Sequence, residues 1–127
     1  MLNTTAIFVG IFALIHIPFT VFVGYHRART GIQFFDGGDV RLLRKMRAHG
    51  NFTEQVPIAL LAMAAAEATG APRWVLLVGG IALLLGRAIH AFVVAKSGWG
   101  NGRAVGMVLT LFAIGWMGSI ALFRALL

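Results

Sequence analysis

The stretch "RAHGNFTEQVP", Arg47 to Pro57, decides how many membrane-spanning helices the chain can form. The apolar run that begins at its end, Val56 to Ala66, is only about half as long as the roughly 20 residues that a spanning helix needs. If the helix begins near Leu43, the polar stretch belongs to it and the helix reaches full length. The chain then has four spans, and one of them carries charged side chains at membrane depth.

The composition indicates a membrane protein. The chain has 127 residues, of which 59% are hydrophobic and only 12% are charged, whereas a typical soluble domain has about 25% charged residues. The apolar residues come in long blocks, which a soluble core of this size could not bury. We therefore expect one integral membrane domain over residues 1–127.

Three further blocks approach the length of a span, at about Thr5 to Tyr25, Trp74 to Ala95 and Ala104 to Leu127. The first lacks a basic start and a cleavage site, so we interpret it as a retained span and not a signal peptide. The connections "RARTGIQFFDGGD", "EATGAPR" and "KSGWGNG" are short and rich in glycine. Short connections favour antiparallel neighbours, so the sequence predicts an all-α, four-helix, up-down bundle.

The distribution of basic residues predicts the orientation. The first and third loops with their flanking helix ends carry eight Lys and Arg residues, whereas the other side has only Arg73 and Arg124. The eight are Arg27, Arg29, Arg41, Arg44, Lys45, Arg47, Lys96 and Arg103. The excess of positive charge places these loops in the cytoplasm and both termini outside. On their own, Arg41, Arg44 and Lys45 are interpreted as solvated or bound to lipid phosphate.

Several classes of function are disfavoured. The net charge of +7 resides at the ends of apolar blocks and is not interleaved with aromatic residues, which is unlike a nucleic-acid surface. The chain has no cysteine, so it offers no thiol nucleophile or thiolate ligand. No metal-ligand His pair, Gly-x-Ser-x-Gly, P-loop or dinucleotide motif is present, so we expect no bound metal.

Polar side chains inside the spans mark the candidate site. Arg47, Asn51 and Glu54 follow each other at i, i+4 and i+7, so they share one helix face. The third block holds Arg87 and, one turn later, His90. A charge at membrane depth is costly unless it is paired or faces a wet cavity, so we predict a Glu54–Arg87 ion pair. The pair either fixes only the helix register or forms part of a pocket for an anionic ligand.

These residues together resemble a known family. "RAHGNFTEQVP", then "LLGRAIHAF", then "NGRAVG" is similar to the MAPEG family, membrane-associated proteins in eicosanoid and glutathione metabolism, and particularly to its small bacterial members. The likeness covers essentially the whole chain. It implies a homotrimer of four-helix subunits, with sites between neighbouring subunits near the cytoplasmic face, where glutathione binds in a bent shape.

The resemblance also implies roles for single residues. Arg47, Asn51 and Glu54 match positions that hold the charged ends of glutathione, and Arg27 or Arg29 matches a basic position at the end of the first helix. Arg87 matches an arginine common on the third helix. Arg103, contributed across the subunit interface, resembles the arginine that stabilises the glutathione thiolate; taken alone, it could be only a positive-inside anchor. Gln55, His90 and Val94 stand where glutathione-using members often have tyrosines, although His90 can still donate a hydrogen bond.

The favoured expectation is a glutathione-dependent transferase or peroxidase-like enzyme of the bacterial inner membrane, with glutathione as co-substrate and a hydrophobic small molecule as the electrophile. A non-catalytic protein of the same fold that binds lipid or another anionic ligand remains the alternative. Transport is less favoured, because the sequence has neither an internal repeat nor a broken helix.

Overall fold

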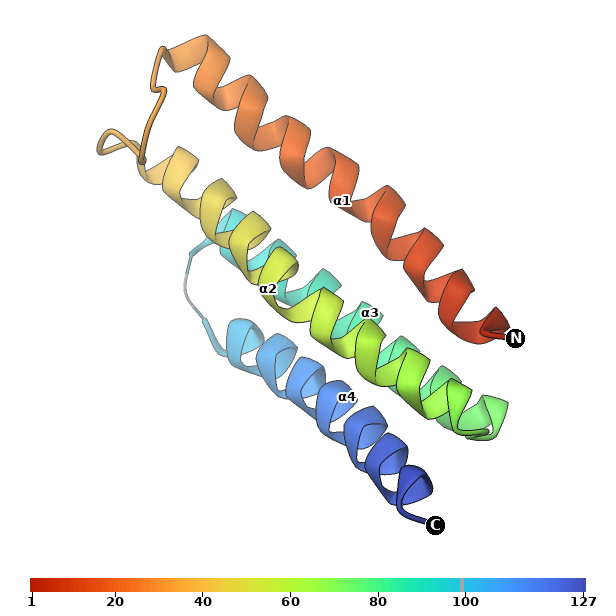
Figure 1. The fold of residues 1–127 in the computed structure, drawn as a ribbon. Coiled ribbons are helices and arrows are strands. Elements are labelled where there is room, and N and C mark those ends of the chain that lie inside the picture. Colours follow the sequence, from red (N-terminus) through yellow and green to blue (C-terminus); the bar gives the residue numbers. More distant parts are fainter. Residues whose placement is uncertain (99) are drawn as a thin grey trace.

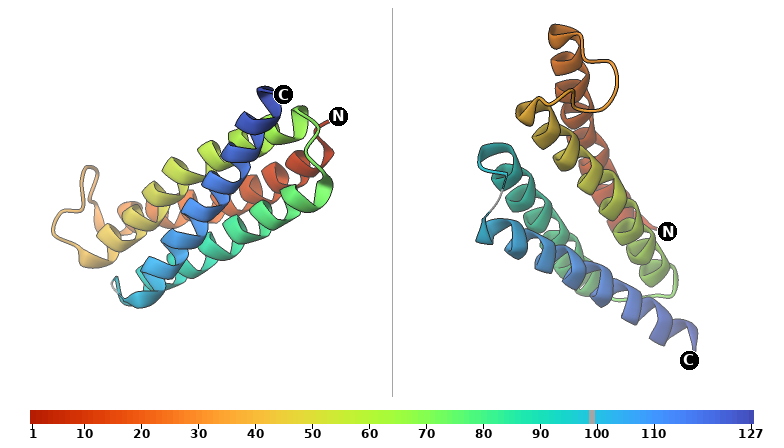
Figure 2. Two further views of the ribbon diagram at one scale, coloured as in Figure 1. Left: turned by 90° about the horizontal axis from the view of Figure 1, so that it is seen from below. Right: turned by 90° about the vertical axis from the view of Figure 1, so that its left-hand side faces the viewer.

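The computed structural model describes residues 1–98 and 100–127, and within these residues the chain is helical without any strand. The helices are α1 (Asn3–Thr30), α2 (Val40–Ala68), α3 (Arg73–Lys96) and α4 (Asn101–Ala125). They run alternately up and down, so both termini lie at the same end of the bundle (Figure 1, Figure 2). The all-α class and the four predicted helices are confirmed. The predicted turn between α3 and α4 includes Trp99, which lies outside the described residues.

The helix α2 is central and differs from its neighbours. Like α3, it packs against all three other helices, but among the described helices α1, α3 and α4 are the ones that are long and apolar enough to cross a membrane. With 29 residues, α2 is about 44 Å long and so exceeds a hydrocarbon core of about 30 Å. Its first turns, which carry the basic residues, can therefore extend beyond the apolar layer.

The helix α1 continues further than predicted. The sequence predicts a loop from Arg27 onward, but the helix continues to Thr30. It ends at Gly31, whose φ of 71° is the left-handed conformation that glycine adopts without strain, and whose N–H donates to the Arg27 carbonyl. The Arg27 guanidinium then donates to the carbonyls of Ile32 and Gln33 at 3.2 and 3.0 Å. Four residues assigned to the loop are thus helical.

The start of α2 is fixed by Asp39. Its carboxylate accepts hydrogen bonds from the N–H groups of Arg41 and Leu42, at 2.8 and 3.1 Å, as an N-cap. Its second oxygen lies 2.8 Å from His26 Nε2 at the end of α1. The hydrogen bond from His26 and the two N–H groups lower the pKa of Asp39. This contact joins the ends of α1 and α2 across the first loop.

The backbones of the helices α3 and α4 come close together at two glycines. A Cβ added to Gly86 would lie 2.9 Å from the Gly106 carbonyl oxygen, and one added to Gly106 would lie 2.7 Å from the Gly86 carbonyl oxygen. Small residues thus allow the two backbones to approach closely at this crossing, as is common between membrane helices. The contact positions Arg87, the residue after Gly86, directly against α4.

The opposite end of the bundle is closed by Glu67, near the end of α2. Its two carboxylate oxygens accept the N–H groups of Thr4 and Thr5, at 2.8 and 2.7 Å, in the first turn of α1. These N–H groups have no partner within their own helix. A buried apolar cluster lies inward of this cap and includes Phe8, Phe12, Met63, Leu83 and Met117.

Candidate functional site

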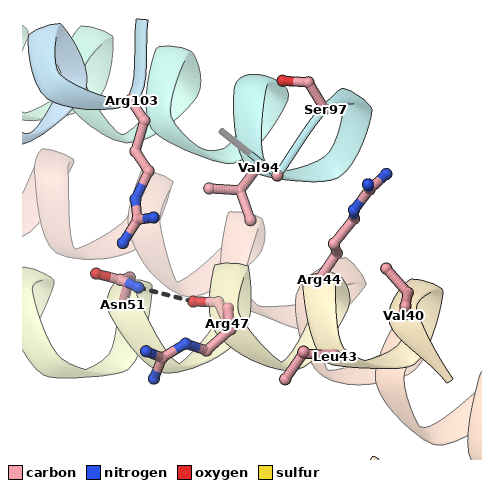
Figure 3. A pocket seen from close by; sticks show the side chains of 9 residues that line it. Val40, Leu43, Arg44, Arg47, Asn51, Val94, Ser97 and Arg103 are labelled. Carbon is pink, nitrogen blue, oxygen red and sulfur yellow. Dashed lines mark hydrogen bonds between the residues drawn. The ribbon is translucent and has the colours of Figure 1, made fainter. Parts of the chain in front are cut away.

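A pocket of about 370 Å³ lies at the end of the bundle that holds the first and third loops, between the start of α2, the end of α3 and the start of α4 (Figure 3). This volume is within the range of about 300–1,000 Å³ typical of small-molecule sites. The lining residues are Val40, Leu43, Arg44, Arg47, Asn51, Val94, Ser97, Gly98 and Arg103. Three of them are arginines and none is acidic, so the pocket suits an anion.

The polar side chains reach the pocket from two helices. Arg103 extends from α4 toward Asn51 on α2, and Arg44 extends from α2 toward the end of α3 (Figure 3). Arg44 also donates to the Lys96 carbonyl at 3.4 Å. The Asn51 side-chain nitrogen donates to the Arg47 carbonyl at 2.9 Å, which fixes the amide on the wall of the pocket. The predicted residues Arg47, Asn51 and Arg103 are thus brought together within one chain.

Arg87 lies buried behind this wall, with only 4% of its surface exposed. It donates from Nε to the Thr110 hydroxyl at 2.9 Å and from Nη1 to the main-chain carbonyl of Asn51 at 3.3 Å. A longer contact of 3.5 Å joins Nη2 to the Gly106 carbonyl. Arg87 therefore connects α3 to both α2 and α4 and holds the backbone at Asn51 in place.

The predicted Glu54–Arg87 ion pair is wrong for this chain. Glu54 is exposed and forms no ion pair among the described residues, while Arg87 uses neutral oxygens instead. The reason is which face of α2 is turned toward the core. Phe52 and Val56 are buried, and Glu54 lies two residues from each, so its side chain points about 200° around the helix axis from theirs. Glu54 therefore points away from α3, toward the outside of the bundle.

His90 lies one turn beyond Arg87 and is 1% exposed. Its Nε2 makes no hydrogen bond within the described part of the chain. It packs behind the pocket, where a Cβ on Gly106 would approach the His90 Cβ to 2.8 Å. Val94, one turn later, does line the pocket, whereas Gln55 is half-buried and does not.

The two predicted arginines of α1 lie outside the pocket. The Arg27 guanidinium is engaged by the carbonyls after α1 and by the Met46 sulfur at 3.3 Å. Arg29 is exposed and stacks over the Tyr25 ring, with its guanidinium carbon 5.8 Å from the ring centroid. Within one chain, the site contains neither of them.

Sequence reasoning missed two kinds of residue. Ser97 and Gly98, at the end of α3, line the pocket although the sequence places them in an ordinary turn. Thr110 and Gly106 on α4 hold Arg87 from behind. Thr110 had a signal that could have revealed it, because it is a hydroxyl within an otherwise apolar span and lies one turn after Gly106.

Comparison with known proteins agrees with the observed architecture. The profile of the MAPEG family matches residues 5–123, which reach from the first turn of α1 to the last turns of α4. The inner membrane protein YecN of Escherichia coli K12 is 34% identical over 88 residues, which are 69% of this chain and 67% of YecN. YecN of Escherichia coli O6:H1 matches to the same extent. No solved structure matches the chain significantly.

Proposed function

Because the chain belongs to the MAPEG family, we propose that it is a glutathione-dependent transferase or peroxidase-like enzyme that acts on hydrophobic electrophiles. The observation that carries the proposal is the pocket at the polar end of an apolar bundle, with Arg44, Arg47 and Arg103 in its wall. We place the protein in the bacterial inner membrane, in line with its YecN relative. We further propose that the pocket end faces the cytoplasm, which the excess of Lys and Arg at that end supports.

The charges of the pocket complement those of glutathione. The tripeptide has two carboxylates and one ammonium, and a guanidinium binds a carboxylate through two parallel hydrogen bonds. We assign Arg44 and Arg47 on α2 to the carboxylates. Arg103 on α4 then remains for the sulfur, beside Asn51, which is suited to hydrogen-bond the peptide backbone of the ligand.

The proposed chemistry needs only a stabilised thiolate. A free thiol of the cysteine type has a pKa of about 8.5, and a nearby guanidinium lowers it by favouring the charged form. The thiol proton leaves to solvent through the open pocket. The thiolate then attacks the electrophilic carbon, so that a sulfur–carbon bond forms and the leaving group departs with its electron pair.

We propose that the site is completed in a homotrimer. Within one chain the described lining of the pocket has no carboxylate for the glutathione ammonium, whereas Glu54 on α2 is exposed and forms no ion pair with any residue that the structure describes. An exposed glutamate on an apolar span is favourable when another subunit covers it with a cationic partner. We therefore assign the ammonium to Glu54, which lies two turns from Arg47 on the same face of α2 and would be covered by the neighbouring subunit, and we assign Arg27, at the basic end of α1, to the rim of the same site.

The test is glutathione binding to the detergent-purified protein, measured by calorimetry, with the ultraviolet absorbance of the thiolate followed against pH. We expect saturable binding and a thiol pKa below about 8.5. Arg103→Ala should remove the pKa shift and the conjugation of an activated chloroarene, whereas the control Arg73→Ala, at the far end of the bundle, should retain both. Absence of binding at millimolar glutathione would overturn the proposal.

A further inference from the structure

Two other cavities adjoin each other on a different face of α2. A polar pocket of about 440 Å³ is lined by Tyr25, His26, Arg29, Thr30, Arg41 and Lys45. An apolar pocket of about 290 Å³ lies between α1, α2 and α3, and its walls include Phe19, Phe22, Ala48, Phe92 and Ala95. Lys45 lines both cavities, so the apolar one ends at the polar one. We call the two together the α1–α2 groove.

The α1–α2 groove is separate from the arginine pocket. Arg41, Lys45 and Ala48 line the groove at i, i+4 and i+7 of α2, which is one helix face. The arginine pocket uses a different face of the same helix, which holds Arg44 and Arg47, and it shares no lining residue with the groove. A ligand could therefore occupy either cavity without entering the other.

The position of Lys45 at the junction is fixed by a chain of contacts. Its Nζ lies 3.1 Å from His26 Nδ1, and His26 Nε2 lies 2.8 Å from the Asp39 carboxylate. With the His26 proton on Nε2, the ring donates to Asp39 and accepts from Lys45. The ammonium is thus held where the apolar wall meets the polar one.

The polar end of the α1–α2 groove has an excess of positive charge. Arg29, Arg41 and Lys45 line it without any acidic residue among its described lining, and the nearby Asp39 carboxylate is engaged by His26. Lys96 adds a further cation at the α3 side, with its Nζ 5.7 Å from the centroid of the Phe92 ring. Tyr25 and Thr30 supply hydroxyl groups beside these charges. Phosphate oxygens are suited to such a set of donors.

We propose that the α1–α2 groove binds an anionic phospholipid, with the phosphate headgroup among Arg29, Arg41 and Lys45 and an acyl chain along Phe22, Phe19 and Pro18. The groove runs from Arg29 to Pro18, 11 residues or about 16 Å along α1. A free phosphate would use only the polar end, and an uncharged lipid only the apolar part. An anionic lipid uses both, and its headgroup lies at the depth where the spans leave the hydrocarbon layer.

The test compares three probes on the intact purified protein in detergent: phosphatidylglycerol, phosphatidylcholine and inorganic phosphate, with bound lipid counted by native mass spectrometry. We expect phosphatidylglycerol to bind preferentially. Arg41→Gln and Arg29→Gln should each weaken it about fivefold, and the control Arg73→Gln should not. Ala95→Trp, which fills the exposed apolar wall, should block the lipid. Thermal unfolding of each variant confirms that it is folded.

Three outcomes would overturn the lipid assignment. Equal binding of phosphatidylglycerol and phosphatidylcholine would show that the cations do not recognise the headgroup. Competition by inorganic phosphate, together with unchanged binding in Ala95→Trp, would show an anion site without an acyl groove. An equal loss in Arg73→Gln would show general attraction to the basic surface. Glutathione binding is measured separately, so failure of one proposal does not decide the other.

Discussion

Arg87 on α3 donates its Nε–H to the hydroxyl of Thr110 on α4 across 2.9 Å, in the buried layer behind the arginine pocket. The same hydroxyl donates to the Gly106 carbonyl at 2.8 Å. Thr110 thus accepts a hydrogen bond from the charged guanidinium and donates one to the backbone of its own helix. Because the guanidinium also reaches the Asn51 carbonyl, this pair links the wall of the pocket to the α3–α4 crossing.

Thr110→Val should destabilise the protein. The substitution retains the shape of the side chain but leaves the buried Arg87 Nε–H without its acceptor, and hydrogen bonds to charged groups are worth about 1.5–3 kcal/mol. We expect a corresponding fall in the unfolding midpoint in detergent. Thr53→Val is the control, because Thr53 is exposed and its hydroxyl donates to the His49 and Gly50 carbonyls of its own helix. Equal stability of the two variants would show that the Arg87–Thr110 bond is unimportant.

Gly106→Ala should weaken the contact between α3 and α4. The added Cβ would lie 2.7 Å from the Gly86 carbonyl oxygen, and the backbone there can move only if the two helices separate. Overpacking of this kind costs about 1–3 kcal/mol. Gly115→Ala, on the same helix, has nothing within 4 Å of its Cβ and should be neutral or slightly stabilising. Thermal unfolding of both variants checks this, and a stable Gly106→Ala variant would contradict the close crossing.

The sequence predicted the number and positions of the helices better than which face of each helix is buried. Three helices were predicted from apolar blocks, the second from a short apolar run extended through the polar stretch, and the turn at Gly70 from its glycine and proline, because span length and backbone freedom are local properties. The partners of Arg87 could not be predicted from nearby residues in the sequence. They depend on which faces of α2 and α4 are turned toward α3, and a polar group on either helix could accept hydrogen bonds from the guanidinium. The sequence offered Glu54 as the charged choice, but packing of Phe52 and Val56 turned Glu54 outward.

Glu67→Gln should loosen the start of α1. Both carboxylate oxygens accept N–H groups, from Thr4 and Thr5, and a negative charge is favourable at a helix N-terminus. The neutral amide retains at most one acceptor there, so we expect a loss of about 1 kcal/mol. Hydrogen exchange of the first α1 turn should become faster, while exchange in the middle of α3 stays unchanged. Protection of Thr4 and Thr5 at the original level would contradict the cap.

Glu54→Gln should weaken ligand binding while leaving the stability of the protein nearly unchanged. Since Glu54 is exposed and makes no ion pair with the residues that the structure describes, its replacement should leave the free energy of unfolding nearly unchanged, within about 0.5 kcal/mol. Under the proposed function, calorimetry should nevertheless show weaker glutathione binding. A large fall in stability without any change in binding would return Glu54 to a structural role and remove it from the site.

Asp39 should make the join between α1 and α2 sensitive to acid. Its pKa is lowered in the folded protein by the His26 hydrogen bond and by the N–H groups of Leu42 and Arg41. A carboxyl whose folded pKa lies below its unfolded value of about 3.9 stabilises the fold at higher pH, and that contribution is lost as pH falls below about 4 through the folded pKa.

The unfolding midpoint of the wild type and of Asp39→Asn is measured from pH 6 down to about pH 2. It should fall more steeply in the wild type, because Asp39→Asn lacks the contribution of the carboxylate at every pH. Asp36→Asn, in the same loop, should follow the wild type. Parallel curves for the wild type and Asp39→Asn would show that the carboxylate does not hold the two helix ends together.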